Sequence, residues 1–447
     1  MPTLSTISAE LQLLIIELLN CPPSSFIPRP NADLLSLSLV DKSLRALVLP
    51  NLFCDVTLVN DEKCGSSVKA ILTGAAAGLV KNLHYIGIKS ITLDFETPIS
   101  NDDDSTEEPS SALPDSVAYV LSNLSRLPNL EKLTVEFRVA NTEEEDQEQY
   151  REIFYDYFDD LDTGDDTIEL ERQESFRLLV KHLYASIARN PPSTIKHLEL
   201  KNTIAKECSV WHTSGFQAIL QNLVSFTLSI RGGDMGAESG VNVLQGYQDF
   251  VRHTNVYFFR HVHRLENLSF SASADGLCGL SGVAHIPLPL QIGDMANLRN
   301  LQLRHVFISI HLVDFLIAHG ESLQSIELHN ASSGLGCELA QDAISWTEFF
   351  SAMATNECKA LRSLIVDSAL EKLKPDAYDS EIYQEETAIR AHDLRQKFPG
   401  RRMFDYAELD MKYGTLYPND REAFPRFVQG DDHRAWEQLM QVIAGNS

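Results

Sequence analysis

The hydrophobic and polar positions of this chain return to one short pattern, LxxLxL, in which another aliphatic residue or Phe can replace Leu. In an extended strand the last two apolar residues of the pattern point to one face and their neighbours point to the other. The pattern therefore predicts a series of short strands, each with one buried face. It occurs at 130–135, 195–200, 223–228, 265–270, 298–303, 323–328 and 361–366, with a looser instance at 83–95.

Amphipathic helices are predicted between and after these strands, because apolar residues recur there at helical spacing. Strands that alternate with helices predict an α/β fold, a stacked parallel sheet backed by helices over 80–370, with a helical cap at 371–447. A non-repeat α/β domain is the alternative interpretation. The apolar helix faces consist of Phe176, Leu179, Val180, Leu183 and Ile187, of Trp346, Phe349, Phe350 and Met353, and of Trp436, Leu439, Met440 and Ile443.

The first sixty residues have a different, purely helical pattern. Apolar residues at helical spacing predict one helix over 8–19, a Pro-rich segment interrupts it, and two further short helices are predicted from about 33 and from 41 up to Pro50. Three short helices bury little apolar surface on their own, so we expect leftover apolar residues to contact a partner. An ordinary three-helix cap on the repeat domain is the alternative.

Charge narrows the possible partners. The 447 residues include 37 Lys and Arg and 63 Asp and Glu, a net charge of −26, which disfavours nucleic acid and anionic membrane surfaces as partners. Two acidic segments, 101–108 and 141–174, carry −5 and −13 of this charge. We interpret both as solvated loops or insertions, and a tract that binds a basic partner is the alternative.

Signals for catalysis, metal binding or membrane insertion are weak. The chain has no apolar run long enough to span a membrane, and its N-terminus does not resemble a signal peptide. Seven scattered cysteines without a CxxC motif indicate reduced thiols in the cytoplasm or nucleus. No common catalytic or phosphate-binding motif occurs, and the histidines near 253–263 lack a convincing metal-ligand spacing. We therefore expect no enzyme activity, cofactor or metal, although a hydrolase site without a recognisable motif is a third interpretation.

The N-terminal string resembles an F-box. The resemblance rests on IS-x-E-L-x(3)-II-x(2)-LL followed by DLLSLSLVDKSLRALVLPNLFCDVTL, whose ending is common in fungal F-box proteins, and it covers residues 5–58. Ser8 stands where the family usually has Pro, and the loop after the first helix is longer than usual. The resemblance implies an F-box domain at 1–58 that docks a Skp-family adaptor and, through it, a cullin–RING ubiquitin ligase. The implied adaptor-binding residues are Ile7, Leu11, Ile15, Leu34, Leu37, Val40 and Leu44.

The repeated strand pattern resembles a degenerate leucine-rich repeat. The Asn or Cys that normally follows each strand is missing, so the resemblance implies an irregular solenoid. Polar residues that flank the buried positions are expected side by side on its exposed strand face, where a target protein binds. Arg304 and His329 on adjacent strands could meet an acidic or phosphorylated group, or merely balance carboxylates such as Glu327. The candidate target-binding residues are His197, Lys201, Gln302, Arg304, Glu327 and His329.

These resemblances imply a non-catalytic function. The chain is expected to be the substrate-recognition subunit of an SCF-type ubiquitin ligase, in which the F-box recruits the adaptor and the repeat domain selects an unknown target protein. The alternative is an F-box-like scaffold that acts outside the ligase. No nucleic-acid or membrane partner is expected.

Overall fold

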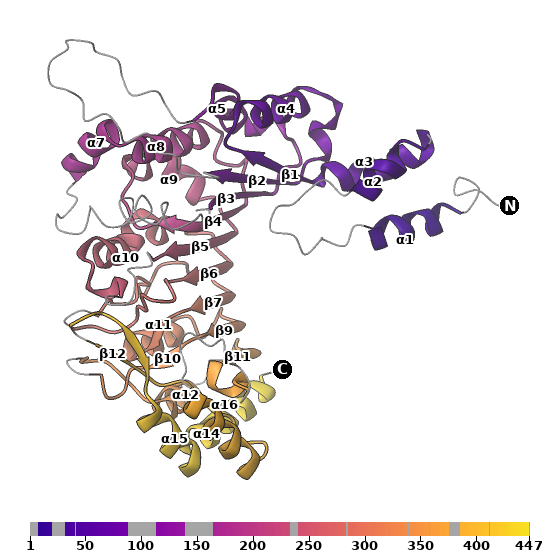
Figure 1. The fold of residues 1–447 in the computed structure, drawn as a ribbon. Coiled ribbons are helices and arrows are strands. Elements are labelled where there is room, and N and C mark those ends of the chain that lie inside the picture. Colours follow the sequence, from indigo (N-terminus) through magenta and orange to yellow (C-terminus); the bar gives the residue numbers. More distant parts are fainter. Residues whose placement is uncertain are drawn as a thin grey trace.

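A computed structural model of the chain describes most of the expected helices and strands (Figure 1). The described residues are 8–19, 32–40, 42–87, 113–138, 164–232, 240–282, 285–337, 340–356, 358–374, 385–410 and 412–446. The acidic segment 101–108, residues 141–163 and Ile7 lie outside them.

Nine parallel strands form the main sheet within the described residues, in the order in which they follow one another along the chain. This confirms the α/β class and places a strand at every predicted LxxLxL pattern. The strands are β1 (Asp55–Val59), β2 (Asn82–Gly87), β3 (Lys132–Phe137), β4 (His197–Ile204), β5 (Ser225–Arg231), β6 (Asn267–Ser271), β7 (Asn300–Arg304), β9 (Ser325–His329) and β11 (Ser363–Asp367).

Each strand begins two residues after the first apolar residue of its pattern, because the same local hydrogen bonds recur at every step. Val224, for example, accepts from the backbone N–H groups of Glu266 and Asn267 through one carbonyl oxygen, and Glu266 accepts in the same way from Arg299 and Asn300. Within each strand the second and fourth residues are buried, as expected from the alternation of side chains.

The sheet begins earlier than the sequence analysis predicts. Its edge strand is β1 at 55, not a strand near 80. The segment FCDVTL was interpreted only as the end of the helical region, although Phe53, Val56 and Leu58 follow the LxxLxL spacing. Both Val56 and Leu58 are buried in the main core, so this segment is the first strand of the sheet.

Helices gather on one side of the column of strands (Figure 1). The predicted face of α8 is largely buried, and that of α12 is fully buried. The helices along the sheet are α4 (Glu62–Thr73), α5 (Asp115–Ser122), α7 (Gly164–Gln173), α8 (Ser175–Ala188), α9 (Ser214–Leu220), α10 (Gln245–Tyr257), α11 (Ile310–Ala318) and α12 (Trp346–Thr355), with 3-10 turns that include η4 (Ser209–His212).

One part of the acidic segment 141–174 is not a solvated loop. Residues 164–173 form α7, and the carboxylate of Glu171 is fully buried. It lies 3.0 Å from Lys181 Nζ and accepts from the Ser209 amide at 2.7 Å. The expectation failed here because a buried carboxylate is tolerated once an ion pair and hydrogen bonds replace its water.

The C-terminal residues pack helices against the last strands. Leu439 and Ile443 of α16 are buried in the main core, which confirms the predicted apolar face of this helix. The elements here are α13 (Ala369–Lys372), α14 (Glu385–Lys397), α15 (Asp420–Gln429), α16 (Asp431–Gly445), the antiparallel pair β12 (Ala407–Leu409) and β13 (Leu416–Pro418), and, upstream, the small pair β8 (Phe307–Ile308) and β10 (Ser332–Ser333).

Candidate functional site

The N-terminal helical unit comprises α1 (Ala9–Leu19), α2 (Ala32–Ser38) and α3 (Lys42–Cys54). Ser8 begins α1 as a cap, because its hydroxyl accepts from the Leu11 amide at 3.5 Å and its carbonyl accepts from Gln12 at 3.0 Å. Helix α3 was expected to end at Pro50, but it continues through the proline to Cys54. The loss of one backbone hydrogen bond at the proline is tolerated within this helix.

The unit has its own small core. Ile16, Leu34, Leu37, Leu44 and Val48 are buried against one another, in a cluster separate from the core of the sheet. Leu34, Leu37 and Leu44 were expected among the leftover apolar residues that contact the adaptor, but they are buried in this core instead. With so few apolar residues available, the three helices use these side chains to hold themselves together.

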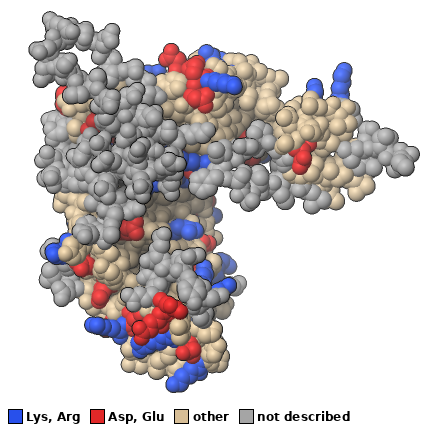
Figure 2. Space-filling model, in the orientation of Figure 1, with Lys and Arg blue, Asp and Glu red and all other residues tan. Residues whose placement is uncertain are grey.

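A second set of aliphatic side chains on the same unit faces solvent. Leu11 is 52% exposed and Val40 is 62% exposed, as expected for two candidate anchors, while Ile15 is half-buried. Figure 2 shows that the atoms of this unit facing the viewer are mostly uncharged. The exposed large aliphatic side chains among the described residues of the unit are Leu11, Leu13, Leu14, Leu35, Leu39 and Val40.

Sequence reasoning missed four of these exposed residues. In α2 nearly every second residue is Leu, so the pattern alone did not separate Leu34, in the core, from Leu35, in solvent. The number of Leu residues in this helix could have revealed them, because a seven-residue helix cannot bury Leu on all sides in so small a unit.

The second candidate surface is the sheet face opposite the helices. The strand register places Gln302 beside Glu327, and Arg304 beside His329, as the alternation predicted. His197 and Lys201 lie on the same face of β4, which is three strands from β7 and four strands from β9 in the sheet. All six candidate target-binding side chains therefore belong to one surface, although what they bind stays a prediction.

His329 already contacts neighbouring carboxylates. Its imidazole lies 3.1 Å from Glu327 and 3.4 Å from Asp367, and the Gln302 amide lies 3.1 Å from its Nε2 atom. The interpretation that this histidine balances carboxylates therefore describes it better than a free anion site does. Arg304 is exposed at the end of β7, so its charge is available to a partner.

The N-terminal strands of the face are charged but internally paired. Glu199 lies 2.7 Å from Lys132 and 3.1 Å from Lys201, so Lys201 is already engaged. Glu136 lies 2.6 Å from His84 and 2.6 Å from Arg138.

These ion pairs shift the acidity of both glutamates. Burial alone would raise the pKa of Glu136, but hydrogen bonds and charge from His84 and Arg138 outweigh it and lower the pKa to about 2. Burial also opposes ionisation of Glu199, whose pKa is nevertheless lowered by Lys132 and Lys201.

The middle strands form a hollow on this face that is lined mostly by uncharged polar side chains. It encloses about 660 Å³ and is open to solvent, with hydroxyl and amide side chains on its floor and Glu327 at one edge. Its polar lining residues are Ser225, Thr227, Asn267, Ser269, Asn300, Gln302, Ser325 and Glu327. Such a surface offers many hydrogen-bond donors and acceptors to a partner.

The described residues contain no group of three or more His, Cys, Asp or Glu side chains that could hold a metal ion. Nor does any helix among them have the length and apolar character needed to cross a bilayer. Comparison with known proteins finds no matching family model and no matching curated protein.

Proposed function

We propose that this chain is a non-catalytic substrate-recognition subunit of an SCF-type cullin–RING ubiquitin ligase. The observation that carries the proposal is the apolar surface of the N-terminal helical unit, where six large aliphatic side chains stay exposed beside a core of five within the described residues. Exposed apolar patches of this kind mark protein–protein contacts. The unit lies to one side of the strand column (Figure 1), where a partner has access.

In this proposal the helical unit is an F-box that docks a Skp-family adaptor. Leu11 and Val40, together with the neighbouring exposed leucines, act as anchors that fill apolar pockets of the adaptor. The residues of the internal core contribute indirectly, because they hold the three helices in place. Ser8, which departs from the usual Pro, still begins the first helix through its side-chain cap.

The sheet is proposed to be a leucine-rich-repeat-like domain that captures the target protein. Support comes from the chain-ordered parallel strands, the recurring hydrogen bonds at each strand start and the polar side chains aligned across the open face. Repeat domains commonly bind partners on such a continuous strand face.

Affinity purification of the tagged full chain from cells tests the proposal. The wild-type chain should co-purify with a Skp-family adaptor and a cullin, and the double variant Leu11→Asp with Val40→Asp should lose both. Ile292→Asp is the matched control, because Ile292 is a similarly exposed aliphatic residue on the sheet domain. An adaptor recovered without a cullin would favour the scaffold alternative, and a double variant that binds like wild type would contradict the proposed interface.

A further inference from the structure

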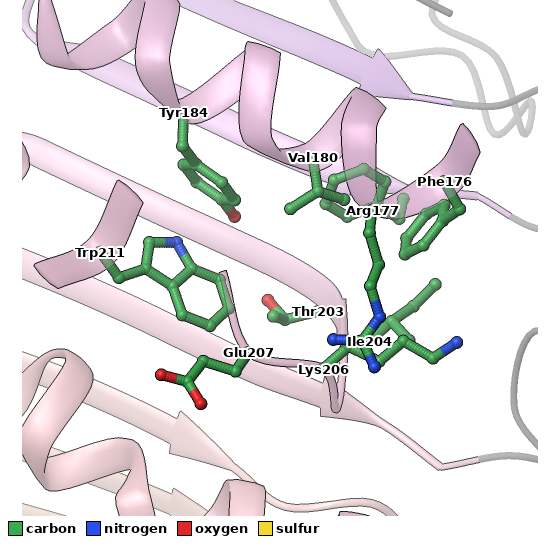
Figure 3. Close-up of a pocket in the computed structure, with 10 residues that line it drawn as sticks. Phe176, Arg177, Val180, Tyr184, Thr203, Ile204, Lys206, Glu207 and Trp211 are labelled. Carbon is green, nitrogen blue, oxygen red and sulfur yellow. The ribbon is translucent and has the colours of Figure 1, made fainter. Parts of the chain in front are cut away.

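A second, internal pocket lies between α8 and the end of β4, with η4 closing one side (Figure 3). It encloses about 320 Å³ of empty space, part of it open to solvent, and its innermost part has room for about one water-sized group. Phe137, Phe176, Val180 and Ile204 give it apolar walls. It is separate from both surfaces described above.

Three buried polar groups in this pocket have no hydrogen-bond partner. They are the hydroxyls of Tyr184 and Thr203 and the indole N–H of Trp211. Figure 3 shows these three polar atoms directed into the same space from α8, β4 and η4. Native proteins rarely leave one such group unpaired, because burying it without a partner is costly. Three together indicate that something normally occupies the pocket.

The backbone of β4 is specially shaped to place one of them. The register of β4 against β5 shifts between Leu200 and Thr203, and Asn202 has a left-handed φ of 52°. Without this bulge, Thr203 would face the open side of the sheet, since Leu198 and Leu200 face inward. Bulges that redirect a side chain are frequent beside functional sites.

The chemistry of the lining defines the occupant. The Trp211 indole can only donate a hydrogen bond, and burial raises the pKa of Tyr184 well above its usual range, so its hydroxyl also stays available as a donor. The occupant must therefore supply acceptor atoms. Arg177 and Lys206 also lie in this lining, although Glu207 lies there too and Arg177 is paired with Glu174 at 2.9 Å. The demand for an acceptor therefore rests on the three unpaired donors and not on a net positive charge.

We propose that this pocket binds a small organic carboxylate. One carboxylate oxygen accepts from Tyr184, Thr203 and Trp211 in the narrow interior, and a short apolar chain lies against Phe137 and Phe176 toward the opening. This inference does not depend on the proposed function, because none of these residues belongs to the helical unit or to the open sheet face.

Titration of the purified full chain with sodium butyrate, followed by calorimetry and tryptophan fluorescence, tests the proposal. Sodium chloride and 1-butanol are the comparison ligands, which lack the carboxylate. We expect saturable butyrate binding that Tyr184→Phe and Thr203→Val each weaken by about tenfold or more, because each removes a hydrogen bond to a charged group. Neither comparison ligand should compete.

Tyr247→Phe is the matched control. Tyr247 is also a buried tyrosine, but its hydroxyl donates to Gly276 at 2.7 Å and accepts from the Ser273 amide at 3.0 Å. We expect it to leave butyrate affinity unchanged while lowering the denaturant midpoint, whereas Tyr184→Phe without ligand should leave that midpoint equal or higher. The proposal would be overturned if butyrate does not bind, or if Tyr184→Phe leaves the butyrate affinity unchanged. It would also be overturned if Tyr184→Phe lowers the denaturant midpoint as Tyr247→Phe does, since that result would indicate a buried water in the pocket.

Discussion

Two neighbouring leucines of α2 offer a sharp test of how the N-terminal helical unit is built. Leu34 is 1% exposed in the core of the unit, whereas Leu35, next to it in the same helix, is 49% exposed. Replacing either with Ala removes the same atoms and changes helix propensity equally. Any difference between the two variants therefore reports burial alone.

The expected magnitude follows from the size of the core. Five buried aliphatic side chains, at roughly 1.5–3 kcal/mol each, stabilise the described part of the unit before the entropy of folding is subtracted. Truncating a buried Leu to Ala costs about 2–5 kcal/mol, a large part of this small sum. Leu34→Ala should therefore unfold the unit locally, while Leu35→Ala should change its stability by no more than about 0.5 kcal/mol.

Amide hydrogen exchange measures this stability element by element. In Leu34→Ala, protection of the amides in α1, α2 and α3 should fall by at least about 30-fold, since 1.4 kcal/mol corresponds to a factor of ten. Protection in β4 to β7 should stay unchanged. Equal protection in the two variants, or a loss of protection in the sheet, would refute the assignment of a separate core to this unit.

Three further predictions concern the sheet domain. Glu136→Gln should lower the unfolding free energy at pH 7 by about 2–3 kcal/mol in urea titrations, because the carboxylate pKa is about 2 in the folded chain and near 4.5 in the unfolded chain. The difference from wild type should shrink as pH falls from about 5 toward 3, and a constant difference would contradict the ion-pair account. Asp405→Ala should cost about 2–4 kcal/mol in the same assay, because this buried carboxylate accepts from the backbone amides of Ala369 and Leu370 at 2.8 and 3.0 Å; a loss below about 0.5 kcal/mol would argue against this role. Arg304→Glu should remove target proteins from affinity-purified complexes while the adaptor is retained, and an unchanged partner list would exclude this face as the reader of the target.

The strands could be predicted from the sequence because their pattern has a physical cause. A period of two, with both inner positions apolar, is required wherever one strand face packs on helices, so each LxxLxL pattern became a strand. The edge strand β1 was not predicted, because its pattern was ambiguous. Its residues satisfied two patterns at once, and the helical interpretation took precedence.

The candidate sites were less predictable, because they depend on which residues meet in space. Period alone could place Arg304 beside His329, but it could not show that Glu327 and Asp367 already surround this histidine. Likewise, Tyr184 and Trp211 belong to different elements, and Thr203 reaches them only through a local bulge. No local pattern in the sequence encodes such a meeting.

The central claim is tested most directly by mixing the purified full chain with a purified Skp-family adaptor and mapping the contact by amide hydrogen exchange. The account predicts one adaptor bound per chain, with added protection in α1 to α3 around Leu11 and Val40 and none on the open face of the sheet. It also predicts that Leu35→Ala weakens binding without loss of folded structure, because Leu35 belongs to the exposed surface. No complex, or protection confined to the sheet, would contradict the proposed F-box function.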